Sequence, residues 1–240
     1  MDNRFDGLTD PSLSLPAAAL AKPFAPRLLA AVVALGAAVW GFLFLTDEVD
    51  EGATAAFDRA LILMLRQSID PNLLRGPAWL HETARDITAL GGFTVLALVT
   101  IAALAVMIVY RRRRQAIVFG VTAVAAQVLA EVIKHIVGRP RPVFVAHYDL
   151  IASASFPSGH AMMAPAIYFT LAAIVAAGEL RPAARVLLMM GSAALVTAIG
   201  VSRVYLGVHW PTDVIAGWTL GSAVALIAWL ALRWPGRPPA

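Results

Sequence analysis

Long apolar runs separated by short polar segments dominate the chain. Six of them approach the roughly 20 residues, with a range of about 17 to 25, that a helix needs to cross a bilayer. They are residues 28–45, 91–110, 115–133, 161–178, 186–201 and 214–232. The runs lack the apolar–polar alternation of barrel strands, and lipid cannot satisfy the hydrogen bonds of an open backbone. The pattern therefore predicts an all-α fold, a bundle of six transmembrane helices.

Residues 47–90 are too polar to span the membrane. Within them, residues 55–65 carry apolar side chains at helical spacing around Asp58 and Arg59. This pattern predicts a helix lying in the membrane interface. Asp70-Pro71 marks a turn, and a second polar helix is expected to run into the span that starts near residue 91. The segment is predicted either to pack on the bundle, or to cap a site within it or gate the entry of a lipid.

The positions of lysine and arginine predict the orientation of the spans, because cytoplasmic loops are enriched in both. If the N-terminus is cytoplasmic, eleven of the nineteen cationic residues lie inside, including the run 111–114. We therefore predict a multi-pass protein of the cell (inner) membrane with both termini cytoplasmic, and we place the segment 47–90 outside. The run 28–45 lacks a small-residue cleavage site and is predicted to be a retained helix. Residues 1–26 and 235–240 are predicted to be tails that flank one membrane-embedded domain, 27–234.

Composition narrows the class of protein further. Hydrophobic residues make up 60% of the 240 residues and charged residues only 14%, against about 25% charged in soluble domains. This balance excludes an ordinary cytosolic enzyme, a disordered protein and a nucleic-acid binder, although the net charge is +4. The absence of cysteine excludes a disulfide framework, a thiol nucleophile and a cysteine-ligated zinc site.

Strongly polar residues crowd the ends of three spans. With the N-terminus inside, all of them emerge on the outer side of the membrane. The groups are Lys134, Arg139 and Arg141; Ser158, Gly159 and His160; and Ser202, Arg203, His209 and Asp213. Ionisable residues at membrane depth are costly, so a converging set of this kind indicates a functional site.

The cationic members of this set suit a phosphate group. Lys134, Arg141 and Arg203 would form a clamp, because the planar guanidinium pairs two phosphate oxygens and lysine adds a point charge. Ser158 and Gly159 precede a predicted helix whose free N–H groups favour an anion. The chain thus offers a phosphate site at the outer ends of its spans.

Two histidines and a carboxylate add reaction chemistry to this clamp. His209 and Asp213 are four residues apart across a helix start, so the carboxylate can hold one ring nitrogen and leave the other as a nucleophile. His160 would be the general acid and base. No cluster of carboxylates suited to Mg²⁺ accompanies them, so we expect a phosphohistidine mechanism with no metal and no cofactor.

The spacing of these residues resembles a known family. Lys134-x6-Arg141-Pro142, Pro157-Ser158-Gly159-His160 and Ser202-Arg203-x5-His209-x3-Asp213 are similar to the three signature motifs of the type 2 phosphatidic acid phosphatase superfamily. The resemblance implies metal-free hydrolysis of a lipid phosphomonoester or pyrophosphate, of the undecaprenyl pyrophosphate, phosphatidylglycerophosphate, phosphatidic acid or lipid A type. It also implies the roles given above for the two histidines, Asp213 and the phosphate-binding residues.

Several interpretations stay open at this stage. The same site would serve a phosphotransferase that moves phosphate between lipids, or a non-catalytic membrane protein that binds or transports anions. Arg139 lies outside the motifs and is interpreted as a surface charge rather than a phosphate contact. Glu131, one turn before Lys134, is expected to form a local ion pair with it. The sequence predicts no oligomeric state.

Overall fold

The computed structural model describes residues 25–143 and 153–233, and within these ranges the secondary structure is helical apart from one isolated bridge between Arg66 and Leu74. The predicted all-α fold is confirmed. The predicted tails, except for residues 25 and 26, lie outside the described residues. The helices are α1 Ala25–Asp50, α2 Ala55–Met64, α3 Ala78–Ala89, α4 Phe93–Val109, α5 Arg113–Val137, α6 Gly159–Ala176, α7 Pro182–Tyr205 and α8 Pro211–Arg233.

In the part of the chain that the structure describes, five helices, α1, α5, α6, α7 and α8, are long and apolar enough to cross a membrane. The predicted second span differs from the others: α4 has only 17 residues, the short end of the range for a crossing helix, and it continues from α3 across a bend of 46°. The bend falls at Gly91 and Gly92, where the backbone of Gly92 is extended and caps α4. Within the described residues, the six predicted crossings thus correspond to five continuous helices and one bent pair, which makes a sixth if it forms one span.

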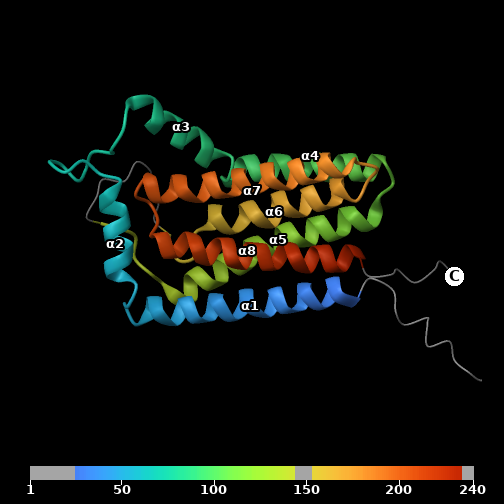
Figure 1. Cartoon of the computed structure of the whole chain (residues 1–240), viewed down its shortest axis with the longest axis horizontal. Coiled ribbons are helices and arrows are strands. Elements are labelled where there is room, and N and C mark those ends of the chain that lie inside the picture. The colour runs from blue at the N-terminus through green and yellow to red at the C-terminus, as the bar shows by residue number, and fades with distance from the viewer. Residues whose placement is uncertain (1–24, 144–152, 234–240) are drawn as a thin grey trace, which may run out of the picture.

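The core of the bundle is built around α6, which packs against α4, α5, α7 and α8 (Figure 1). Small residues allow α6 and α8 to approach closely, as in other membrane bundles. A methyl group added at Gly217 would lie 2.9 Å from the carbonyl oxygen of Ser158 and 3.0 Å from the backbone nitrogen of Met162. This contact fixes the position of the turn that opens α6.

The segment between α1 and α4 folds onto one end of the bundle. Helix α2 lies across that end, and α3 slants back towards α4 (Figure 1). Arg66 donates a hydrogen bond to the Tyr205 carbonyl at 2.7 Å, and the Tyr205 hydroxyl donates to the Arg75 carbonyl at 2.8 Å. Leu74 is buried against Tyr205 and Leu206. The predicted packing of this segment on the bundle is therefore confirmed.

The start of α1 and the end of α8 lie at the opposite end of the bundle from α2 (Figure 1). The end of α5, the start of α6 and the connection between α7 and α8 lie at the α2 end. The topology therefore gathers the three motif segments at one end, as the order of spans predicts.

Candidate active site

Backbone hydrogen bonds join the three motif segments directly. The Ser158 N–H donates to the Asp213 carbonyl at 3.0 Å, which links the start of α6 to α8. The Ser155 N–H donates to the Arg139 carbonyl at 2.8 Å, which links the same turn to the segment after α5. The site is thus held by main-chain contacts between segments that lie far apart in the sequence.

His209 lies at the centre of the site with 2% of its surface exposed. Its Nδ1 lies 3.3 Å from Asp213 Oδ2, and its Nε2 lies 3.1 Å from an Arg141 guanidinium nitrogen. The Trp210 N–H also donates to Asp213 Oδ2 at 3.0 Å, so the backbone at the start of α8 holds this carboxylate. Asp213 therefore favours the tautomer with the proton on Nδ1, and the Nε2 lone pair faces the cations.

The surroundings of His209 keep its imidazole neutral. Burial lowers the pKa of His209 well below its ordinary value of 6.5, and the charges of Arg141, Arg203 and Lys134 lower it further, against a smaller opposing effect of a hydrogen bond with the Ser155 backbone. A neutral imidazole with an unprotonated Nε2, which here accepts a hydrogen bond from Arg141, is the form that can act as a nucleophile once a phosphate takes the place of that contact.

Arg141 and Arg203 are held in fixed positions around this ring. Arg141 donates to the carbonyl oxygens of Ser153 at 2.9 Å and Val208 at 2.6 Å. Arg203 is 1% exposed and donates to the Thr88 hydroxyl at 3.0 Å, a contact that reaches from α7 to α3. Because these side chains are already ordered, binding an anion requires little further loss of conformational freedom.

Lys134 and the start of α6 form the neighbouring wall. The Lys134 ammonium group lies against Gly159, where an added methyl group would come within 3.4 Å of Nζ. Ser158 caps α6 by accepting a weak hydrogen bond of 3.5 Å from the Ala161 N–H. Because Gly159 has no side chain, the Lys134 ammonium group can lie close to the N-terminus of α6, and both favour a bound anion.

His160 follows on the first turn of α6 and lies beside the bend between α3 and α4. A methyl group added at Gly92 would lie 3.6 Å from its Nε2. His160 interacts electrostatically with His209 and with Arg203, Lys134 and Arg141. The structure thus brings together all the predicted site residues: Lys134, Arg141, Ser158, Gly159, His160, Arg203, His209 and Asp213.

The interpretation of Arg139 as a surface charge is wrong. Its side chain is 12% exposed, and its two terminal nitrogens donate to Asp213 Oδ1 at 2.6 Å and to Asp58 Oδ2 at 2.7 Å. Local spacing did not reveal this contact because Asp58 belongs to α2, 81 residues earlier. The one available signal was an acid inside the apolar segment 55–65.

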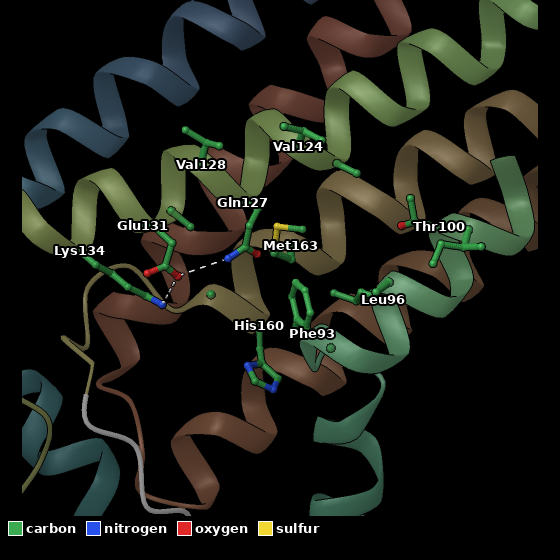
Figure 2. Close-up of a pocket in the computed structure, with 16 residues that line it drawn as sticks. Phe93, Leu96, Thr100, Val124, Gln127, Val128, Glu131, Lys134, His160 and Met163 are labelled. Atoms are coloured by element: carbon green, nitrogen blue, oxygen red, sulfur yellow. Dashed lines mark hydrogen bonds and ion pairs between the residues drawn. The ribbon is translucent and has the colours of Figure 1, made fainter.

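A groove between α4 and α5 leads to this site (Figure 2). Its volume is about 440 Å³, and most of its lining is apolar, including Leu96, Val124 and Met163. Lys134 and His160 lie at its end (Figure 2). The predicted ion pair between Glu131 and Lys134 is confirmed at 3.1 Å, and Gln127 donates weakly to the same carboxylate oxygen at 3.4 Å.

Comparison with known proteins defines the class to which this fold and site belong. Residues 115–237 match the family model of the PAP2 superfamily. The chain is 31% identical to phosphatidylglycerophosphatase B of Bacillus subtilis over 75% of this chain and 85% of that protein. It is 35% identical to a decaprenylphosphoryl-5-phosphoribose phosphatase of Mycobacterium tuberculosis over 60% of this chain and 76% of that protein.

A solved structure of a PAP2-type phosphatase has a similar fold. The transmembrane PAP2-type phosphatidylglycerolphosphate phosphatase of Bacillus subtilis superposes with a TM-score of 0.71 at 28% identity, covering 81% of this chain and 93% of that one. The chain belongs to the PAP2 superfamily and is a multi-pass membrane protein. The predicted enzyme class, a phosphoric ester hydrolase, is confirmed by these relatives.

Proposed function

We propose that the protein hydrolyses a lipid phosphomonoester or pyrophosphate through a phosphohistidine at His209. The observation that carries this proposal is the geometry of the His209 ring, with Nδ1 on Asp213 and Nε2 directed at Arg141. A neutral ring held in this tautomer beside fixed cations has what a nucleophile towards phosphorus requires.

The proposed reaction has two displacements at phosphorus. In the first, Nε2 of His209 forms a bond to phosphorus while the bond to the lipid oxygen breaks, and His160 gives a proton to that oxygen. In the second, a water oxygen forms a bond to phosphorus while the bond between phosphorus and Nε2 breaks, His160 takes a proton from the water, and inorganic phosphate leaves with His209 restored. Arg141, Arg203 and Lys134 stabilise the negative charge on the phosphoryl oxygens in both transition states.

Metal independence is part of the proposal. The three cations and the N-terminus of α6 supply the positive charge that Mg²⁺ supplies in many phosphoryl-transfer sites. Activity in the presence of EDTA tests this directly.

The groove supports a lipid as the substrate. Its apolar walls lie on the outside of the bundle between α4 and α5, while its end carries Lys134 and His160. A lipid chain lying in this groove would place its phosphate at the cations. The relatives act, by their names, on phosphatidylglycerophosphate and on undecaprenyl diphosphate, the latter in Sulfolobus acidocaldarius, and we propose a substrate of this class.

The side of the membrane is also a proposal. Exposed arginines gather at the end of the bundle opposite the site, so the positive-inside rule puts that end in the cytoplasm and the site on the extracytoplasmic side. Because the chain has no cysteine, Glu51→Cys and Arg112→Cys can each be labelled without background. An impermeant maleimide added to intact spheroplasts should label the first and not the second; the reverse pattern contradicts this orientation.

The test of the function is phosphate release by purified protein in detergent with EDTA. Undecaprenyl pyrophosphate, phosphatidylglycerophosphate, phosphatidic acid and lipid A are offered in parallel. We expect release from at least one lipid, inhibition by vanadate, and a loss of about 10³-fold or more in His209→Ala. Phosphate that appears only on an acceptor lipid identifies a phosphotransferase instead. A fully active His209→Ala protein, or a strict need for Mg²⁺, overturns the mechanism.

The groove has its own test. Ala97 lines it, whereas Leu98, the next residue on α4, is exposed and lies outside the lining. Ala97→Trp should raise KM for a long-chain lipid about tenfold, because it removes volume that the chain needs, and spare a short-chain soluble phosphate. Leu98→Trp is the matched control and should change neither. Equal effects of both variants on both substrates contradict the groove as the lipid site.

A further inference from the structure

Helix α2 contributes a carboxylate to the interior of the catalytic end. Asp58 is 0% exposed, although it lies in a short and otherwise mostly exposed helix. It accepts hydrogen bonds from Arg139 at 2.7 Å, from the Thr212 N–H at 3.0 Å and from the Thr212 hydroxyl at 2.6 Å. Burying a charged group is costly unless it is paired, and here the pairing is to the helix that carries Asp213.

Arg139 connects Asp58 to the carboxylate that holds His209. One terminal nitrogen donates to Asp213 Oδ1 at 2.6 Å and to the Thr212 hydroxyl at 2.8 Å, and the other donates to Asp58. The guanidinium also lies 5.2 Å from the ring centre of Trp210. Asp213 is thus held on both oxygens, Oδ1 by Arg139 and Oδ2 by His209 and the Trp210 N–H.

We propose that Asp58 and Arg139 are positioning residues for the proposed nucleophile, acting through Asp213. The proposal rests on the proposed function of His209 and extends it by two residues outside the three motifs. Arg139 fixes the rotamer of Asp213, so that Oδ2 faces Nδ1 of His209. Asp58 fixes Arg139 and offsets its charge, so that Asp213 keeps its negative electrostatic effect on the imidazole.

The two residues act on His209 with opposite charge. Loss of the Asp58 charge leaves Arg139 uncompensated and should lower the pKa of His209; loss of the Arg139 charge should raise it. The other charged or titratable groups around His209 are unchanged in both cases: Lys134 from α5, Arg141 after α5, His160 from α6, Arg203 from α7 and Asp213 from α8. A residue that only stabilised the fold would not produce opposite shifts.

The experiment compares Asp58→Asn, Arg139→Gln and Arg139→Lys with the wild type. In both neutral variants we expect kcat to fall about 10- to 100-fold with KM within about twofold, because the nucleophile is misplaced while the phosphate clamp remains. The acid limb of kcat/KM should move to lower pH in Asp58→Asn and to higher pH in Arg139→Gln, by about half to one unit. Arg139→Lys keeps the charge, so it should lower kcat without moving the limb.

Glu51→Gln is the matched control, because it removes the same charge from an exposed position shortly before α2. It should leave kcat and the pH profile unchanged. A thermal melt and the fraction of protein that binds vanadate separate folded from unfolded protein in every sample.

A second readout does not depend on turnover. The chain has five histidines, and ¹⁵N labelling of their rings allows the His209 titration to be followed by NMR, with His209→Gln providing the assignment. Opposite shifts of this titration in Asp58→Asn and Arg139→Gln support the proposal even if no tested lipid is hydrolysed, in which case the proposed function alone fails. Folded variants in which His209 titrates as in the wild type, or kcat stays within twofold, overturn it.

Discussion

Cationic side chains gather at both ends of the bundle, but their surroundings and their exposure differ between the two ends. At the catalytic end Arg141, Arg203 and Lys134 surround a buried histidine and are held by carbonyl, hydroxyl and carboxylate oxygens. At the opposite end six exposed arginines line a cavity of about 730 Å³: Arg111, Arg112, Arg113, Arg114, Arg185 and Arg233.

The arginines at the opposite end have hydrogen-bond partners that account for their positions without a binding site. Arg114 donates to the Ala231 carbonyl at 2.6 Å, and Arg185 donates to the Gly178 carbonyl at 3.0 Å. These carbonyls lie at or just beyond helix C-termini, where cations are favourable. Positive charge alone therefore does not define the catalytic end; burial, fixed geometry and the adjacent histidines do.

Among the variants that compare the two ends, removing a cation that is held beside His209 has the largest expected effect. Arg141→Gln and Arg203→Gln should each lower kcat/KM about 10²- to 10³-fold, because each leaves developing phosphoryl charge without a fixed partner. Phosphate release in detergent measures the effect, and a thermal melt that matches the wild type checks that the fold is kept. Retention of more than a third of the wild-type activity in either variant would erase the distinction between the two ends.

The second-largest expected effect is a loss of stability when the close packing of α6 and α8 at the catalytic end is disturbed. Gly217→Ala places a methyl group against the backbone of Ser158 and Met162, so α6 and α8 must move apart. We expect a destabilisation of about 1 to 3 kcal/mol, seen as a lower melting temperature in detergent. Gly191→Ala on α7, where an added methyl group meets nothing within 4 Å, is the control. Equal melting temperatures for the two variants contradict the close contact.

The pH dependence tests the environment of His209. Since its pKa lies well below 6.5 in the folded protein, the neutral nucleophile persists as the pH falls through 6.5 and is lost only below that. The acid limb of kcat/KM should therefore lie under pH 6.5. In Arg141→Gln one of the cations that lowers the pKa is absent, so the limb should move upwards. A wild-type limb at or above 6.5 contradicts this electrostatic picture.

The smallest effect is expected at the arginine-rich end. Arg112→Gln and Arg113→Gln, alone or together, should change kcat/KM in detergent less than twofold, because these exposed side chains lie at the far end of the bundle from His209. A loss comparable to that of Arg141→Gln would show that this end takes part in turnover.

The sequence predicted the spans and the motif residues because both depend on local spacing. Apolar run lengths identify helices, and the order of spans brings Lys134, His160 and His209 to one end without any knowledge of packing. The predicted pair of Glu131 and Lys134 is likewise one helical turn. Contacts between residues within one turn of a helix can therefore be predicted from the sequence alone.

Contacts between distant segments were not predictable in this way. Arg139 reaches Asp58 across 81 residues, and nothing in the spacing of either residue indicates the other. The bend between α3 and α4 was predicted only as a polar helix running into a span, and its position beside His160 depends on how Gly91 and Gly92 pack. These features need the tertiary arrangement because several helices produce them jointly.

The most direct test of the central claim is the detection of phosphate on His209 during turnover. Purified protein is mixed with ³²P-labelled lipid phosphate, quenched in alkaline SDS and digested. The account predicts a label that is stable in alkali, labile in acid, located on the peptide that contains His209 and missing from His209→Ala. The account would be contradicted if the protein hydrolyses the lipid at a steady rate but the His209 peptide carries no label in samples quenched before one turnover is complete.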